Sequence, residues 1–262
     1  VGAGTVKMLQ EHADDLALRA GRAIEIAAVS ARDRGAERGL DIGAYRWLDD
    51  PLALVQDDDV EVVVELIGGS EGVAKELCEA TIRGAKHVVT ANKALIAHHG
   101  TALARAAEAA EVTFGYEAAV AGGIPIIKTL REALAGNRLN RVYGILNGTC
   151  NTILSAMTDQ GREFEDVLAE CQELGYAEDD PSFDVDGIDT AHKLAILASV
   201  AFGGEVNFDA VHIEGIRHVS LMDMQFASEL GYSIKLLGVA SVREDGLEQR
   251  VHPCMVPSSS PI

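Results

Sequence analysis

A carboxylate and an amine stand four residues apart at the start of a strongly apolar segment. In the stretch EDDPSFDVDGIDTAHKLAILASVAF, residues 178–202, Asp189 and Lys193 come just before the apolar run LAILASVAF. Side chains four residues apart lie on the same face of an α-helix, so we expect these two to meet. A helix that is apolar on all sides is expected to be buried, and a charged pair at its mouth therefore needs an explanation.

Two interpretations of this pair are open. Asp186 is placed to cap the helix, and Asp189 falls in its first turn, where an acid compensates the free N–H groups and the helix dipole. This purely structural interpretation is strong for Asp189. It is weaker for Lys193, because partial burial and the positive helix start both disfavour the charged amine. Both effects are expected to lower the pKa of Lys193, which suits a proton donor or acceptor.

The loop before this helix is acidic, with carboxylates at Glu178, Asp179, Asp180 and Asp184. A solvated surface is one explanation for such a cluster. The other is a site that binds the ammonium group of an amino-acid substrate, because a carboxylate cluster attracts a cation.

Glycines at the start of the chain indicate a phosphate-binding turn. In a dinucleotide-binding unit, the motif G-x-G-x-x-G joins the first strand to a helix whose N-terminus binds the pyrophosphate. Only Val1 and Gly2, at its end, are present, and no strand precedes them. A plain turn ahead of a helix is the commoner meaning of such a glycine pair. The absence of an initial Met and of the first strand suggests a fragment of a longer protein.

The segment VSARDRG, residues 29–35, bears on the choice of cofactor. NAD sites usually carry Asp or Glu at the end of the second strand, whereas an Arg there suits the extra phosphate of NADP. The segment contains Arg32 and Arg34 and therefore favours NADP, with Arg32 the preferred contact and NAD the alternative. The alternative explanation for these arginines is a charged surface loop in contact with water, without a role in cofactor binding.

Two further candidates follow predicted strands. TANK, residues 90–93, places Lys93 at the carboxyl end of a strand, where ligands bind in open α/β sheets. A Lys at a helix start opposes the helix dipole, which favours a functional role. Glu117 precedes a Gly-Gly loop, where a carboxylate and backbone carbonyls can bind a hard cation, although a Glu that binds the N–H groups of its own loop is commoner.

The alternation of short Val-rich runs with amphipathic stretches predicts βαβ units and a parallel sheet. Near Gly123 the order changes to helices followed by strands, which is typical of an α+β domain. The predicted strands and helices cover these ranges: strands 23–31, 60–69, 87–90 and 111–120 and helices 1–21, 71–85 and 93–110 in the first part, and helices 122–136, 163–174 and 187–202, a strand, Asn-Gly turn and helix within 140–154, and a hairpin at 232–256 in the second.

Composition limits the class of partner. The chain has 262 residues, 48% of them hydrophobic, and a formal net charge of -19, which argues against nucleic-acid and anionic-membrane partners. The four cysteines form no C-x-x-C pair and are expected to be reduced thiols in a cytoplasmic protein. No apolar run reaches the length of a membrane span. His98, His99 and His192 are interpreted as ordinary surface or helix-face residues.

The motifs and their order resemble the homoserine dehydrogenase family. They are TANK, YEAAVAGGIPII, GILNGTCNTIL, GYAEDDPSFDVDGIDTAHK and HVSLMDMQFASELGYSIKLLGVA. The resemblance extends from Gly2 to the last residues. It implies an α/β fold class, with a Rossmann-type NAD(P)-binding domain in residues 1–124 that lacks its first strand, followed by an α+β substrate-binding and dimerisation domain in residues 125–262 that is incomplete at its end.

The resemblance also implies a reaction, the reversible NADP-dependent oxidation of L-homoserine to L-aspartate 4-semialdehyde in threonine and methionine biosynthesis. Lys193 is similar in position to the proton donor and acceptor of the family, and Asp189 and Glu178 to its substrate-binding carboxylates. Asp184 is a further substrate-binding candidate. Lys93 resembles a cofactor-contacting lysine that is an alternative for proton transfer, and Gly175 a glycine near the cofactor.

Glu117 and the backbone carbonyls of Val120, Gly122 and Ile124 resemble a sodium site, which reverses the structural interpretation of Glu117. The family resemblance further implies a cytoplasmic homodimer or higher homo-oligomer. Another semialdehyde reductase is the nearest enzymatic alternative. A non-catalytic NADP-binding sensor is the alternative from another class, and the co-occurrence of Lys193 with the substrate-binding carboxylates argues against it.

Overall fold

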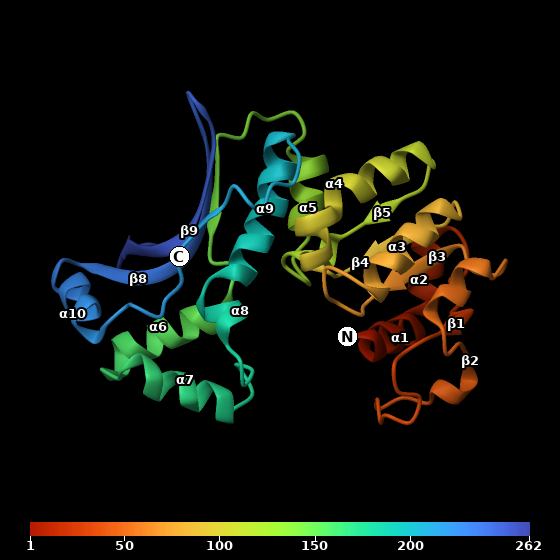
Figure 1. The fold of residues 1–262 in the computed structure, drawn as a ribbon, viewed down its shortest axis with the longest axis horizontal. Coiled ribbons are helices and arrows are strands. Elements are labelled where there is room, and N and C mark those ends of the chain that lie inside the picture. The colour runs from red at the N-terminus through yellow and green to blue at the C-terminus, as the bar shows by residue number, and fades with distance from the viewer. The chain divides into compact units, whose positions relative to one another are not determined.

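The computed structural model describes residues 1–262 and divides into two compact units. The first unit contains Val1–Leu95 and His99–Ala118, and the second contains Ile96–His98 and Ala119–Ile262 (Figure 1). The domain boundary after residue 124 stays a prediction. None of the helices combines the length and the apolar character required to cross a lipid bilayer.

The first unit is built on parallel strands, as the alternating sequence pattern predicts. β1 and β2 form one pair, and β3, β4 and β5 form a second sheet in that order. Helix α3 lies between β3 and β4 in the chain, and α4 between β4 and β5, which is the alternation of a Rossmann-type fold. The bounds of these elements are β1 Ala28–Val29, β2 Arg46–Trp47, β3 Val62–Glu65, β4 His87–Thr90, β5 Phe114–Gly115, α3 Val73–Arg83 and α4 Lys93–Ala109.

The strands of the larger sheet turn alternate residues toward the helices. Val63, Glu65 and Val88 are buried, whereas Val62 and Val64 are exposed. The buried side chains pack with apolar residues of α3 and α4, which form two small clusters around the sheet. This packing fixes the carboxyl ends of β3 and β4, where the TANK motif lies.

Some predicted elements of the first unit are shorter than expected. The helix predicted over residues 1–21 is divided into α1 (Gly2–Glu11) and α2 (Ala13–Ala20), because His12 leaves the helical conformation. Asp14 and Asp15 in the first turn of α2 favour this new helix start. The strands predicted over 23–31 and 111–120 contract to β1 and β5, and short 3₁₀ turns occupy Ile42–Ala44, Pro51–Gln56 and Glu117–Ala119.

The second unit contains a four-stranded sheet in the order β6–β8–β9–β7. β8 and β9 form the predicted hairpin around Glu244 and Asp245, and Figure 1 shows α9 lying against this hairpin. The helix predicted over 122–136 is a short α5 that continues as a π-helical turn, Thr129–Ala133. The bounds of the other elements are α5 Ile126–Lys128, β6 Arg141–Gly144, α6 Gly148–Gln160, α7 Phe164–Glu173, α8 Ser182–Val185, α9 Ile188–Phe202, β7 His212–Ile213, α10 Leu221–Glu229, β8 Tyr232–Arg243 and β9 Gly246–Pro257.

The core of the second unit confirms that α9 is a buried helix. Leu194, Ala195 and Ala198 of α9 belong to one apolar cluster with residues of α6 and with Leu236 of β8 and Val251 of β9. Burial on this scale is the main favourable contribution to folding. The first turn of α9 is therefore held on a rigid support.

Two glycines allow the chain to pack tightly around the start of α9. Gly187, the N-cap of α9, has φ +84°, and a Cβ there would lie 3.1 Å from Val251 Cγ1. A Cβ on Gly215 would overlap the carbonyl oxygen of Val185, which accepts a hydrogen bond from Ile216 N at 2.8 Å. The prediction that Asp186 caps α9 is wrong, because Asp186 ends α8 and its carboxylate pairs with Arg217.

Helix α10 is not predicted by the sequence patterns above. Ser220 Oγ accepts a hydrogen bond from Asp223 N, and the Asp223 carboxylate accepts from Ser220 N, which together form a capping box. The hydrogen bonds from Ser220 lower the pKa of Asp223. The motif S-x-x-D is the local signal that identifies this helix start.

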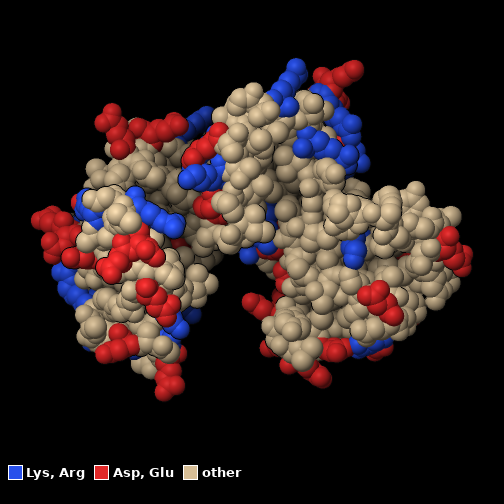
Figure 2. All heavy atoms as spheres, turned by 180° about the vertical axis from the view of Figure 1, so that it is seen from behind, with Lys and Arg blue, Asp and Glu red and all other residues tan.

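The four cysteines are free thiols, as predicted, and three of them are buried. On the face drawn in Figure 2, acidic and basic side chains form scattered groups on a surface that is otherwise mostly tan. Exposed pairs of neighbouring helix residues, such as Lys7–Glu11 and Arg83–Glu79, contribute little to stability. The fold therefore depends on its apolar clusters and on the buried polar contacts described below.

Replacing Gly215 by Ala is expected to lower the free energy of unfolding by about 3 kcal/mol or more, because the new Cβ overlaps backbone atoms of Val185 and Asp186. Gly136→Ala is the matched control, since an added Cβ there has no atom within 4 Å. The control should change stability by less than about 0.5 kcal/mol. Urea denaturation measures both, and equal stability of the two variants would contradict the packing described for the α9 start.

Candidate active site

The side chains of Asp189 and Lys193 meet, as their four-residue spacing predicts. Lys193 Nζ lies 2.7 Å from Asp189 Oδ2, and the two side chains are 17% and 4% exposed. Lys193 Nζ also donates to the carbonyl oxygen of Leu146 at 2.8 Å. The charged pair at the helix mouth is thus largely removed from water and has a second acceptor for the amine.

Asn147 joins this pair to the acidic loop. Its amide nitrogen donates to Asp189 Oδ2 at 2.8 Å and to Asp184 Oδ1 at 2.7 Å. Its amide oxygen accepts from Cys150 N at 2.8 Å, which caps α6. The side chains of Asn147, Asp184, Asp189 and Lys193 are called the Asn147 network below.

The sequence predicts Asn147 only as part of the Asn-Gly turn between a strand and a helix and does not indicate its place in the site. An Asn directly before a helix is the local signal for a cap, and the structure bears out that signal. Nothing in the local pattern indicates its contacts with Asp184 and Asp189, because these residues lie far away in the chain.

A second asparagine on α6 ties the network to the sheet. Asn151 Nδ2 donates to the carbonyl oxygens of Asn147 and Leu236, at 3.0 and 3.2 Å, and its Oδ1 accepts from Leu236 N at 3.0 Å. Asn151 is buried. These bonds satisfy buried polar groups of β8 and hold the start of α6 against the sheet.

The surroundings of the network are negative. Burial, together with the smaller effect of the charges of Asp184, Asp189 and Asp186, raises the pKa of the Cys150 thiol to about 12. The thiol donates to the carbonyl oxygen of Asp184 at 3.1 Å. Cys150 is therefore a neutral packing residue at pH 7 and not a nucleophile.

The carboxylates of the acidic loop, residues 178–184, have separate partners. Asp184 is part of the Asn147 network, whereas Asp180 accepts from Ser182 N at 3.1 Å in a local turn. Hydrogen bonds from Ser182 lower the pKa of Asp180. Glu178 is exposed, and its backbone carbonyl accepts from Gln172 Nε2 at 3.0 Å. The role of the Glu178 carboxylate in substrate binding stays a prediction.

Gly175 lies in the loop that leads to Glu178 and has φ +75°, a conformation that favours glycine. The neighbouring carbonyl of Tyr176 accepts from Thr149 Oγ1 at 3.2 Å, which connects this loop to the start of α6. The contact of Gly175 with a cofactor stays a prediction.

His192 is a helix-face residue of α9, one of its two predicted positions, and it is buried. It is 4% exposed, and its ring lies 4.6 Å from that of Phe208 and 5.5 Å from that of Phe183. The apolar composition of α9 explains this, because most of its side chains are buried. His192 is adjacent to Lys193 in the chain and belongs to the support of the site.

In the first unit, the TANK motif is held by a buried carboxylate. Glu65, at the end of β3, is fully buried, and its Oε2 accepts from Thr90 Oγ1 at 2.5 Å. Glu65 Oε1 accepts from Ile67 N and Gly68 N, at 2.7 and 3.0 Å. A buried carboxylate requires such donors, and here they shape the loop that follows β3.

Asn92 completes this arrangement. Its backbone N–H donates to Thr90 Oγ1 at 2.9 Å, and its side chain caps α4 through Leu95 N at 3.1 Å and donates to Gly69 O at 2.7 Å. Thr90 and Asn92 therefore have structural roles. Lys93, the first residue of α4, is placed by them at the carboxyl end of β4.

The residues predicted to hold a dinucleotide fit that group chemically. Val1 precedes α1 without a side-chain cap, so the first N–H groups of the helix suit a phosphate. Gly2 leaves room for close approach, because a Cβ there would meet no atom within 4 Å. Arg32 is exposed after β1.

Two more arginines lie in the same loop. The guanidinium groups of Arg34 and Arg38 lie 5.7 and 5.9 Å from the centre of the Trp47 ring on β2. Such cation–π contacts orient a guanidinium at modest energetic gain. They hold the loop that carries Arg32 beside the end of β1.

The residues of the predicted sodium site belong to both units, with Glu117 in the first and Val120, Gly122 and Ile124 in the second. Glu117 begins a 3₁₀ turn, and Gly122 has φ +59°. A carboxylate and carbonyl oxygens are ligands that suit a hard cation. The sodium assignment stays a prediction.

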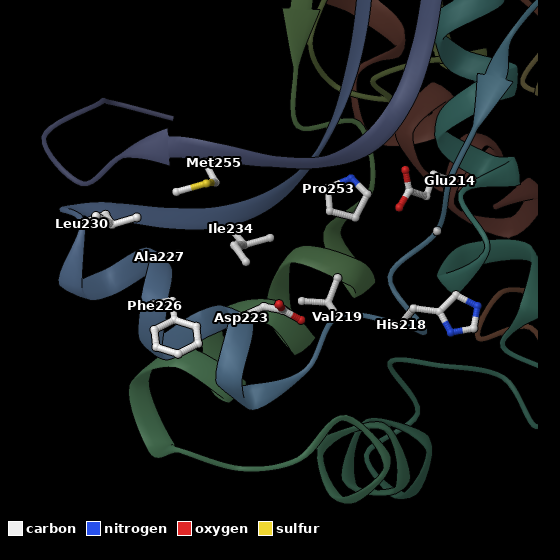
Figure 3. Close-up of a pocket in the computed structure, with 11 residues that line it drawn as sticks. Glu214, His218, Val219, Asp223, Phe226, Ala227, Leu230, Ile234, Pro253 and Met255 are labelled. Atoms are coloured by element: carbon white, nitrogen blue, oxygen red, sulfur yellow. The ribbon is translucent and has the colours of Figure 1, made fainter.

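A separate pocket of about 340 Å³ lies beside α10 and β8 (Figure 3). Its lining is mostly apolar, and of its polar side chains Asp223 is engaged in the capping box with Ser220. None of the residues of the Asn147 network lines it. In the second unit, the side chains suited to acid–base chemistry are therefore those of the Asn147 network at the start of α9.

Two family models match the chain. One describes the NAD-binding domain of homoserine dehydrogenase and covers residues 1–117, and the other describes homoserine dehydrogenase and covers residues 125–262. The chain belongs to the homoserine dehydrogenase family. This confirms the resemblance inferred from the sequence motifs and, with the parallel sheet, the predicted fold class.

Individual homoserine dehydrogenases are similar over nearly the whole chain. The enzyme of Pseudomonas aeruginosa is 52% identical over 258 residues, which are 98% of this chain and 59% of that protein. The enzyme of Neisseria gonorrhoeae is 48% identical, over 99% of this chain and 59% of its own length. The chain thus spans about three fifths of the relatives that it matches.

Solved structures of homoserine dehydrogenases are also similar to this chain. The homoserine dehydrogenase of Thiobacillus denitrificans has a TM-score of 0.96 and 48% identity, and the match covers 100% of this chain and 60% of that one. A hyperthermophilic archaeal homoserine dehydrogenase, determined in complex with NADPH, has a TM-score of 0.70 and 28% identity over 83% of this chain and 62% of that one.

Replacing Thr90 by Val is expected to lower the free energy of unfolding by about 1–3 kcal/mol, because it leaves Glu65 without its hydroxyl donor and Asn92 N without an acceptor. Thr81→Val is the matched control, since Thr81 is equally buried but donates only to its own helix at Leu77 O. Urea denaturation compares the two. A larger loss in the control would contradict the role assigned to Glu65.

Proposed function

We propose that this chain is the cofactor-binding and catalytic part of a homoserine dehydrogenase, which interconverts L-homoserine and L-aspartate 4-semialdehyde. The observation that carries the proposal is the Asp189–Lys193 pair, bridged to Asp184 by Asn147, in a chain covered by two homoserine dehydrogenase models. An alcohol dehydrogenation needs a group that takes the hydroxyl proton, and Lys193 is that group in our account.

In the oxidation direction, the neutral amine of Lys193 accepts the hydroxyl proton of homoserine while the carbinol carbon loses a hydride. A bound oxidised nicotinamide supplies the hydride acceptor. In the reduction direction, the ammonium of Lys193 returns a proton to the oxygen of the former aldehyde. A lysine ammonium has three N–H donors, and the bonds to Asp189 and Leu146 leave one for the substrate oxygen.

The carboxylates serve the other end of the substrate. Asp184 and Glu178 bind the ammonium group of homoserine, and Asp189 orients Lys193 and contributes to the same negative site. Fixing both ends of a small substrate sets the reacting atoms in one geometry, which is a large part of catalysis in enzymes of this kind. Lys93 contacts the cofactor and is the alternative proton-transfer residue.

The cofactor is a nicotinamide dinucleotide, a conclusion supported by the NAD-binding family model and by the NADPH complex of a relative. We assign NADP as the preferred form, with Arg32 at its extra phosphate. Val1, Gly2, Lys93 and Gly175 are the other residues that we assign to cofactor contacts.

Membership of the family supports three further assignments, which are part of the same proposal. A sodium ion binds to Glu117 and to the carbonyl oxygens of Val120, Gly122 and Ile124. The protein is a homodimer or higher homo-oligomer. It acts in the cytoplasm in threonine and methionine biosynthesis.

The full-length protein is expected to reduce NADP in the presence of L-homoserine, followed by cofactor absorbance. Lys193→Ala should lower kcat/KM by roughly 10²–10⁴-fold, the usual contribution of a general base. Lys235→Ala is the matched control, because Lys235 in the same unit donates to Ser155 and takes no part in the Asn147 network. Activity that survives Lys193→Ala and is lost in Lys93→Ala would move the proton transfer to Lys93. No reduction with NADP or NAD would refute the proposed function.

Arg32→Ala is expected to raise KM for NADP about tenfold and to leave KM for NAD unchanged, because a charge-assisted bond to the extra phosphate is lost. Arg22→Ala is the control, since Arg22 is exposed and pairs with Glu61. Steady-state kinetics with both cofactors measures the effect. An equal change for NADP and NAD would show that Arg32 does not determine the preference.

A further inference from the structure

All hydrogen-bonding groups of the Asn147 side chain are used. Its two amide hydrogens point to different carboxylates, Asp184 and Asp189, and its oxygen accepts from Cys150 N. Asn147 itself is 4% exposed. A neutral side chain thus holds two acidic groups that come from different elements, α8 and α9.

The carboxylates of Asp184 and Asp189 share one donor group, so their like charges repel each other. The charged and titratable groups around these two carboxylates offset their repulsion only in part. Lys193 on α9 pairs with Asp189, whereas Arg217 pairs with Asp186 at the end of α8. Cys150 on α6 is a neutral thiol, and His192 on α9 packs against Phe183 and Phe208.

Hydrogen bonds to a carboxylate favour its ionised form. We propose that Asn147 is a positioning residue that keeps Asp184 and Asp189 ionised and correctly oriented beside each other, and through Asp189 sets the place of Lys193. This inference rests on the proposed function for its kinetic consequences, whereas the bridging of the two carboxylates stands on the geometry alone.

The choice of asparagine at this position supports the inference. Ser and Asp cap a helix about as well as Asn, so capping of α6 alone does not require an amide. Only Asn among these residues adds two N–H donors to the cap oxygen. The same chain holds a contrasting residue in Asn151, which is also buried on α6 but bonds only to backbone groups of Asn147 and Leu236.

Substitution at position 147 should therefore change ionisation and not only stability. In Asn147→Ser the cap oxygen remains and both carboxylates lose their shared donor. The ionised forms become less favourable, so protons bind at higher pH than in the unmodified protein. Asn147→Asp keeps the size and the cap but adds a third carboxylate, and its effect should be larger in the same direction.

The first test is the steady-state kinetics of the full-length protein with L-homoserine. KM for homoserine should rise roughly tenfold in Asn147→Ser and further in Asn147→Asp, because Asp184 is no longer held. Asn151→Ser should lose folding stability and leave this KM unchanged. An unchanged KM in both variants of Asn147 would overturn the proposal.

The second test does not depend on activity and so separates this inference from the proposed function. Aspartate labelled with ¹³C at the carboxyl carbon gives NMR signals that follow ionisation, and Asp184→Asn and Asp189→Asn assign them. The pH midpoints of both signals should be higher in Asn147→Ser than in the unmodified protein and unchanged in Asn151→Ser. Equal midpoints in all three proteins would refute the role of Asn147, even in an active dehydrogenase. Shifted midpoints in a protein that does not oxidise homoserine would retain the role and refute only the proposed reaction.

Discussion

The ion pair between Asp189 and Lys193 is the interaction on which the rest of the site depends. Both side chains are largely removed from water, and buried charges are costly unless they are paired and hydrogen-bonded. The surrounding groups meet this requirement, with Asn147 as a donor to the carboxylate and the Leu146 carbonyl as an acceptor for the amine. The apolar remainder of α9 anchors the pair in the core, which explains why charged residues lie at the mouth of a core helix.

The two units solve a similar physical problem in similar ways. In each, a carboxylate that has lost its water is held by neutral donors, Thr90 and backbone N–H groups for Glu65, and Asn147 for Asp189. In each, the donor side chain is itself connected to a helix start, because Thr90 binds the N–H of the α4 cap Asn92 and Asn147 caps α6. Helix starts that carry chemically important residues are therefore fixed by polar contacts as well as by packing.

The sequence predicted the features that are encoded locally. Apolar composition identified α9 as buried, four-residue spacing predicted the contact of Asp189 with Lys193, and turn residues located the β8–β9 hairpin. The contacts that join distant segments were not predicted. Asn147 is 37 residues from Asp184, and Thr90 is 25 residues from Glu65, so their meeting depends on sheet register and helix packing that no local pattern contains. The wrong assignment of Asp186 as a helix cap has the same cause, since its partner Arg217 comes from a distant loop.

A crystal structure of the full-length protein with L-homoserine and a bound nicotinamide cofactor would test the central claim most directly. The account predicts that the substrate hydroxyl lies within hydrogen-bond distance of Lys193 Nζ, about 2.7–3.2 Å, and that its ammonium group contacts the carboxylate of Asp184. It also predicts that Asn147 keeps both of its carboxylate contacts in that complex. A homoserine molecule bound elsewhere, or with its hydroxyl turned away from Lys193, would contradict the account.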